Sequence, residues 1–178
     1  MKNIIIRKLI VDENNELFDA QGMKYVEFES DFSKIREYSG AILENCPRQF
    51  LEGGLLEQQL SEIIKNGIKH GNKNDVSKKL KVWYDLRNRV RFIIEDEGSG
   101  FAQLEAWNDF YRKRQEALYN NDFDLFLQLA AYRGPHSDEF DGGSSLIAAL
   151  EFWNGGMVYN KAKNKIGVVR WFSNGSYQ

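Results

Sequence analysis

The stretch from 55 to 71, LLEQQLSEIIKNGIKHG, constrains the fold more than any other part of the chain. Its apolar side chains recur at helical spacing and predict a helix that must bury one face. These side chains are Leu56, Leu60, Ile63, Ile64 and Ile68. Gly71 is the expected end of the helix, because glycine readily adopts the backbone conformations found at helix C-termini. Such a helix needs an apolar surface to pack on, and the flanking sequence predicts a sheet.

Alternating apolar and polar side chains predict strands on both sides of this helix. The sequence MKYVEFES directs Val26 and Phe28 to one face and Glu27 and Glu29 to the other. An N-terminal strand followed by a polar turn is expected within 3–18. Residues 78–98 predict a hairpin that turns around Asn88, and 155–173 predict a second hairpin.

Three further helical segments complete the pattern. One covers 33–46, with Asp31 or Ser33 as its cap and Pro47 at its end. Residues 102–132 predict two helices broken near Asn120 and Asn121, and a glycine-rich loop then leads into a helix at 146–153. The order of elements predicts an α+β fold, a two-layer α/β sandwich with helices on one face of a mixed, mostly antiparallel sheet. At 178 residues, the chain is most simply one domain, 1–178.

Composition narrows the functional classes. A net charge of -2 shows no overall basic bias, so we expect no nucleic-acid partner. The single cysteine, Cys46, has no intramolecular disulfide partner. No apolar run reaches the roughly 18 residues of a membrane span, so we expect no membrane partner and a cytoplasmic location.

Polar residues stand out at three places. Glu62, Asn66 and His70 are spaced four apart, which predicts a polar stripe along the helix, either a solvated face or part of a site. Asp96 ends an apolar strand and is followed by Gly98 and Gly100. This arrangement either forms a plain turn or presents a carboxylate to a ligand's donors while the glycines let the ligand approach the backbone.

The third place is DGGSSL, from 141 to 146. Gly142 and Gly143 precede a helix that begins with Ser144 and Ser145. Free amides and the helix dipole at such a junction suit phosphate oxygens, and an ordinary serine cap is the alternative.

Together, EIIKNGIKHG, DEGSGF and DGGSSL resemble the N, G1 and G2 boxes of the GHKL superfamily, the Bergerat-fold ATPases. Within that superfamily, the chain is most similar to the bacterial anti-sigma factor serine/threonine kinases. The resemblance covers about 24–172. It implies a histidine kinase-like ATP-binding domain with a helical insertion at about 102–140, and ATP and Mg²⁺ as cofactors.

The resemblance also implies residue roles. Asp96 would accept a hydrogen bond from the adenine amine, Asn66 would bind Mg²⁺, and Glu62 would be the general base or would orient the magnesium shell. The remaining residues implied to contact the nucleotide are Lys69, His70, Gly71, Gly98, Gly100, Phe101, Gly142, Gly143, Ser144 and Ser145.

The chain departs from the family pattern in several ways. Ser145 stands where the G2 box usually has its second glycine, and Gly67 replaces a small alanine in the N box at a cost of about 1 kcal/mol of helix propensity. The insertion is longer than usual and rich in aromatic side chains, which either pack onto the domain or form a partner or dimer surface. Its basic run, 112–114, predicts a solvated helix face, with a phosphate contact as the alternative.

Two functions of different classes follow from the resemblance. The first is an ATP-dependent serine/threonine kinase that phosphorylates a small anti-anti-sigma-like protein, with a sigma factor as a further partner and a homodimer as the assembly. The second is a non-catalytic, nucleotide-responsive protein-binding module. A histidine kinase-like ATPase domain ranks behind both.

Overall fold

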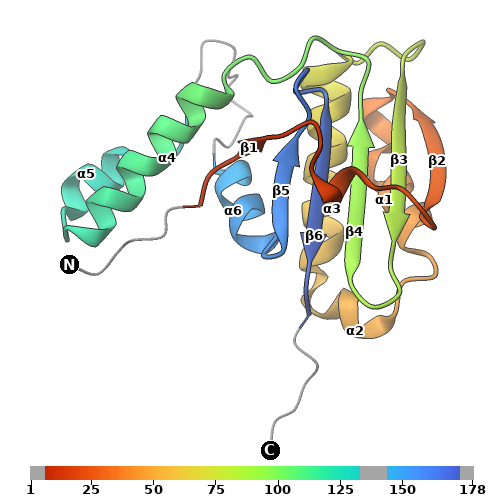
Figure 1. Ribbon diagram of the computed structural model, residues 1–178, viewed down its shortest axis with the longest axis horizontal. Helices are drawn as coiled ribbons and strands as arrows, with labels where there is room; N and C mark the ends of the chain where they lie inside the picture. The colour runs from red at the N-terminus through yellow and green to blue at the C-terminus, as the bar shows by residue number, and fades with distance from the viewer. Residues whose placement is uncertain (1–6, 133–143, 173–178) are drawn as a thin grey trace, which may run out of the picture. The chain divides into compact units, whose positions relative to one another are not determined.

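The computed structural model describes residues 7–132 and 144–172 (Figure 1). Within these residues the chain forms two compact units, which we describe separately. One unit holds residues 10–101 and 152–172 and contains the whole sheet. The other holds residues 7–9, 102–132 and 144–151 and is helical.

The sheet is open, has six strands and is mostly antiparallel, in the order β1-β5-β6-β4-β3-β2. Among the described residues, β1 with β5 is the one parallel pair. The strands are β1 (Ile10–Val11), β2 (Lys24–Glu29), β3 (Lys79–Asp85), β4 (Val90–Glu95), β5 (Gly156–Tyr159) and β6 (Lys165–Arg170). Both predicted hairpins, β3–β4 and β5–β6, are confirmed.

The alternation predicted for β2 is also confirmed. Val26 and Phe28 are partly buried, whereas Glu27 and Glu29 are exposed. The N-terminal strand, by contrast, is shorter than predicted, because among the described residues it contains only Ile10 and Val11. At Leu9, the side-chain amide of Asn108 accepts from the backbone N–H and donates to the carbonyl, both at 2.9 Å. These two bonds occupy the backbone groups that a longer strand would use for pairing.

Helices α1 (Ile35–Leu43) and α3 (Leu55–Asn66) lie behind the sheet in Figure 1, on one of its faces. The five apolar side chains predicted to line the 55–71 helix are all buried, as are Leu80, Val82 and Phe92 of the sheet. Asp31 caps the turn that leads into α1, as one of the two predicted caps. Shorter elements of this unit are η1 (Glu16–Phe18), η2 (Phe32–Lys34), α2 (Arg48–Leu51), η3 (Glu52–Gly54) and η4 (Gly67–Gly71).

The segment before β2 covers part of the other sheet face. A Cβ at Gly167 would lie 3.1 Å from Leu17 Cβ, and Arg91 Nη2 donates to the Asp19 carbonyl at 2.8 Å. Elsewhere this face carries charged side chains in one cross-strand row, including an ion pair of 2.6 Å between Lys165 and Glu95. The architecture is therefore α+β and compatible with the predicted two-layer sandwich.

The helical unit contains α4 (Leu104–Tyr119), α5 (Phe123–Gln128) and most of α6 (Ser145–Phe152). The predicted break is confirmed: Asn121 has a φ of 59°, and the Asp122 side chain accepts from Leu125 N to cap α5. The aromatic side chains of the insertion divide into two groups. Trp107 and Tyr111 stack at 5.2 Å and are buried, whereas Tyr119 and Phe123 are 50% and 57% exposed.

The basic run on α4 behaves as predicted at two of its three positions. Arg112 and Lys113 are exposed and pair with acidic neighbours on the same helix. The prediction is wrong for Arg114, which donates to the carbonyls of Phe126 and Leu129 at 3.3 and 3.0 Å. Its guanidinium also lies 3.9 Å from the centre of the Phe126 ring. Arg114 therefore joins α5 to α4.

Candidate functional site

Asp96 follows β4 directly and is held by its backbone. Its N–H donates to the Asn164 carbonyl, and its carbonyl accepts from Asn164 Nδ2, both at 2.9 Å. Asn164 belongs to the β5–β6 turn, where Asn160 Oδ1 accepts from the backbone N–H groups of Asn164 and Lys165. The turn is therefore built around two asparagine side chains, and it fixes the backbone of Asp96.

The Asp96 carboxylate is half-buried, and burial raises its pKa from 3.8 to about 6. A hydrogen bond from the Gly98 N–H, at 2.8 Å, opposes that rise. The charge of Glu95 adds to the rise, whereas Lys78 and Lys73 lower the pKa. At neutral pH the group is therefore a carboxylate in a partly dry setting, where a hydrogen bond is stronger than in water.

The helix that begins with α3 ends in a π-turn, η4. The Asn72 N–H closes it by donating to the Gly67 carbonyl at 2.8 Å. A Cβ at Gly67 would lie 2.5 Å from Cδ1 of buried Leu80, which explains why this position has no side chain. His70 lies in the π-turn, so the α-helical spacing that aligns Glu62 with Asn66 does not continue to His70.

The π-turn and the loop after β4 touch through their glycines. A Cβ at Gly71 would lie 2.5 and 2.6 Å from the two carboxylate oxygens of Asp96. A Cβ at Gly98 would meet the Gly71 carbonyl and would lie 2.8 Å from Asp96 Oδ1. Gly100 has a φ of +85°, and its Cα faces the Ala162 carbonyl. Gly71 therefore leaves room for the Asp96 carboxylate, and Gly98 and Gly100 leave room for backbone carbonyls. That these glycines also admit a ligand stays a prediction.

Other predicted site residues lie on the same unit. Glu62 and Asn66 are half-buried on the last turns of α3, and Lys65 Nζ lies 2.6 Å from Glu62 Oε2. Lys69 is half-buried and His70 is exposed, both in the π-turn. The Phe101 N–H donates to the Lys163 carbonyl at 3.0 Å, and the Phe101 ring lies 6.0 Å from that of Tyr159. The π-turn at the end of this helix and the loop after β4 thus lie together in the sheet unit, with Gly71 against Asp96.

Of the residues predicted to contact the nucleotide within 142–145, the structure describes Ser144 and Ser145. Ser145 is the first residue of α6, and the Ser144 carbonyl accepts from the Ala148 N–H at 3.1 Å. Both serines belong to the helical unit. Gly142 and Gly143 lie outside the described residues. Their predicted roles at the nucleotide remain predictions.

Asn72 lies beside the candidate site, and the sequence did not predict a role for it there. Its side chain is fully buried and contacts Ser30, Lys79 and Glu97. An asparagine after a helix suggests only a cap or a turn, since the spacing gives no sign of its distant partners.

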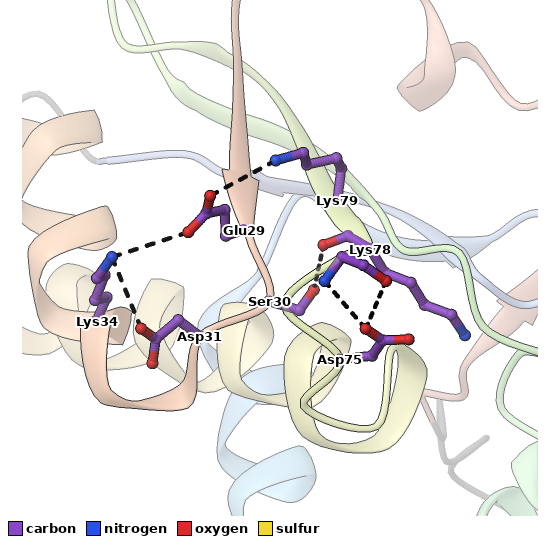
Figure 2. A network of polar contacts seen from close by, with 8 residues as sticks. Glu29, Ser30, Asp31, Lys34, Asp75, Lys78 and Lys79 are labelled. Atoms are coloured by element: carbon purple, nitrogen blue, oxygen red, sulfur yellow. Dashed lines mark hydrogen bonds and ion pairs between the residues drawn. The ribbon is translucent and has the colours of Figure 1, made fainter.

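The strand ends around Asn72 are joined by further polar contacts (Figure 2). Ser30 Oγ donates to the Lys78 carbonyl at 3.1 Å. The Lys78 N–H donates to the Asp75 carbonyl at 2.9 Å. The ion pairs of Glu29 with Lys34 and Lys79, at 3.9 and 4.0 Å, are largely exposed and add little stability. The hydrogen bonds to the Lys78 and Asp75 carbonyls therefore fix these strand ends more than the ion pairs do.

In 7–132 and 144–172, no three His, Cys, Asp or Glu side chains converge on a common point. Magnesium that is shared with substrate phosphates needs only one or two oxygen ligands from the protein, so the side-chain oxygen of Asn66 fits such a role chemically. Cys46 is buried, and burial raises the pKa of its thiol to about 11, so it is an unreactive core residue.

A cavity of about 420 Å³ lies near the β3–β4 turn, at the other end of β4 from Asp96. It is lined by Asp85, Arg87, Asn88, Arg89 and Trp171, and by none of the predicted site residues. It is an open depression beside exposed side chains, where Arg89 stacks over Trp171 at 4.8 Å.

No protein-family model matches the sequence, and no curated protein matches it. Within the part of the chain that the structure describes, no helix is both long enough and apolar enough to cross a membrane.

Proposed function

We propose that this protein binds Mg-ATP in the manner of the Bergerat-fold ATPases and acts as a serine/threonine protein kinase of the anti-sigma factor type. One observation carries the proposal. The half-buried carboxylate of Asp96 lies against Gly71 at the end of the helix that carries Glu62 and Asn66. The two sequence motifs, 62–71 and 96–101, are separated by 24 residues and meet at Gly71 and Asp96. The resemblance makes both residues part of one nucleotide site.

The chemistry of Asp96 suits the recognition of adenine. An ionised carboxylate accepts hydrogen bonds only, and the adenine exocyclic amine is a donor. The carboxylate is ionised at neutral pH, because its pKa of about 6 lies below 7. The Gly98 N–H bonds to one carboxylate oxygen, which orients the group and leaves acceptor capacity for a ligand.

Glu62 and Asn66 supply the groups for phosphoryl transfer. Asn66 would hold magnesium through its neutral side-chain oxygen, and the ion would neutralise charge on the phosphates. Glu62 lies one helical turn earlier, and its carboxylate would take the proton of the serine or threonine hydroxyl. That hydroxyl oxygen would bond to the γ-phosphorus as the bond to the leaving ADP breaks. Lys65, 2.6 Å away, holds that carboxylate in place. The protein substrate is a small anti-anti-sigma-like partner, with a sigma factor as the second partner and a homodimer as the assembly.

A second function, a nucleotide-responsive binding module without transfer, is favoured by the surface of the helical unit. Apolar side chains on α4 and α5 are between 39% and 68% exposed, namely Leu118, Tyr119, Phe123, Leu125 and Leu127. Exposed apolar clusters of this kind are typical of protein-binding surfaces. Transfer of the γ-phosphoryl group to any protein would exclude this alternative.

Calorimetry with Mg-ATP tests the proposal, on wild type, Asp96→Asn and Asn66→Ala. Loss of a charge-assisted hydrogen bond costs about 1.5–3 kcal/mol, so Asp96→Asn should bind at least tenfold more weakly. Asn66→Ala removes the proposed magnesium ligand and should also weaken Mg-ATP binding. Asp85→Asn is the matched control, because Asp85 ends the neighbouring strand far from the proposed site. Equal affinity of wild type and Asp96→Asn, or no binding by wild type at millimolar ATP, would refute the proposal.

A further inference from the structure

The Asn72 side chain is fully buried, and both of its polar atoms make hydrogen bonds. Its Nδ2 donates to Ser30 Oγ at 2.8 Å and to the Lys79 carbonyl at 3.0 Å. Its Oδ1 accepts from the Glu97 N–H at 2.7 Å. The orientation of the amide is unambiguous, because a carbonyl only accepts and a backbone N–H only donates.

These contacts join parts of the chain that are distant in sequence. The Asn72 N–H closes the π-turn on Gly67, and its side chain reaches the end of β2, the start of β3 and the loop after β4. Asn72 therefore holds the π-turn that contains Gly71, its neighbour in sequence, next to the loop that carries Asp96.

The bond to Glu97 bears directly on Asp96. The Glu97 N–H and the Asp96 carbonyl belong to one planar peptide unit. Asn72 Oδ1 holds the N–H of that unit, and Asn164 Nδ2 holds its carbonyl at 2.9 Å. With both ends fixed, the plane cannot rotate, and the direction in which the Asp96 side chain leaves the backbone is set.

We propose that Asn72 is the positioning residue of the Asp96 site: it fixes the Asp96–Glu97 peptide plane and thereby keeps the carboxylate against Gly71. The consequence for ATP affinity rests on the function proposed above, whereas the geometric part does not. Asn72 acts through Asp96 and makes no contact with a nucleotide.

The pKa of Asp96 reports this geometry without any ligand. Burial is the main cause of its rise, so a carboxylate released from its place gains water and its pKa returns toward 3.8. The charged groups that act on it are Glu95 on β4 and Lys73 and Lys78 after the π-turn. On β5, the Tyr159 hydroxyl has a pKa raised first by burial and then by the Asp96 charge.

The experiment compares Asn72→Ser with Asn108→Ser. Asn108 is a matched control, because its side chain also accepts from one backbone N–H and donates to a carbonyl, but in the helical unit. The Asp96 pKa is measured by NMR titration of the carboxyl carbon, and Mg-ATP affinity by calorimetry at a temperature where both variants are folded. We expect Asn72→Ser to lower the Asp96 pKa by a unit or more and to weaken ATP binding at least tenfold, while Asn108→Ser changes neither.

An unchanged Asp96 pKa in folded Asn72→Ser would overturn the proposal. If wild type binds no ATP, the proposed function fails, yet the pKa comparison still decides the role of Asn72. If Asn72→Ser does not fold, two measurements replace it. Ser30→Ala removes one acceptor of Asn72 but keeps the bond to Glu97, so the Asp96 pKa should not move. In wild type, the Glu97 amide should exchange slowly with solvent; exchange at the rate of an open loop would contradict the proposal.

Discussion

Replacing Gly71 with alanine tests the contact between the π-turn and Asp96. The new methyl group would lie 2.5 and 2.6 Å from the two carboxylate oxygens, against an ordinary contact of about 3.5 Å. The carboxylate must therefore move by roughly 1 Å. Gly71 does not have a positive φ, so alanine adds no backbone strain and the effect falls on the side chain of Asp96.

The expected cost has two parts. Crowding of a packed site costs about 1–3 kcal/mol of stability. Displacement of the carboxylate removes its hydrogen bond to the adenine amine, which costs about 1.5–3 kcal/mol, or tenfold or more in ATP affinity. Thermal unfolding measures the first part and calorimetry with Mg-ATP the second.

Gly40→Ala is the matched control. Gly40 lies within α1, and a Cβ there would meet nothing within 4 Å. Alanine should stabilise that helix by up to about 1 kcal/mol and leave ATP affinity unchanged. Wild-type affinity in Gly71→Ala, together with weak binding by Asp96→Asn, would refute the argument that Gly71 sets the position of the carboxylate.

Three further experiments test separate parts of the account, two of them with a matched control variant. Because the pKa of Asp96 is raised to about 6 in the folded protein, the native state binds a proton more tightly than the unfolded state, and stability falls as pH rises from about 4 to about 6. Asp96→Asn should therefore raise the melting temperature at pH 7 but not at pH 4, and an equal effect at both pH values would contradict the burial of the charge. Glu62→Ala should keep ATP affinity and lose phosphoryl transfer at least 100-fold in a labelled-phosphate assay. Glu57→Ala, on the exposed first turn of α3, is the control and should change neither property. Loss of ATP binding in Glu62→Ala would contradict the role of Glu62 as the base. Arg114→Met should speed hydrogen exchange in α5, because about 1–3 kcal/mol is lost when the carbonyls of Phe126 and Leu129 lose their donor. Arg112→Met, which breaks only exposed ion pairs worth at most about 1 kcal/mol, should leave α5 unchanged, and equal exchange in the two variants would contradict the role of Arg114.

Elements with strong periodicity could be predicted from the sequence. The buried face of α3 follows from apolar residues at helical spacing, and the β3–β4 hairpin follows from alternation on both sides of Asn88. The break between α4 and α5 follows from Asn120 and Asn121, since asparagine tolerates the left-handed conformation that Asn121 adopts. These features depend on residues that are close in sequence, so a single sequence is enough to predict them.

Features that depend on distant partners could not be predicted. Leu9 leaves the strand because Asn108, 99 positions away, takes its backbone groups. Arg114 belongs to a basic run that looks solvated, and only the fold of α5 supplies its acceptors. In the candidate site, Asp96 was identified from its place at a strand end, but Asn72 was not, because its partners lie 42, 7 and 25 positions away.

A crystal structure of the protein with magnesium and a non-hydrolysable ATP analogue tests the central claim most directly. The account predicts the adenine amine within hydrogen-bond distance of the Asp96 carboxylate and the magnesium ion on the side-chain oxygen of Asn66. A nucleotide bound elsewhere, for example in the cavity lined by Arg87, Arg89 and Trp171, would contradict it.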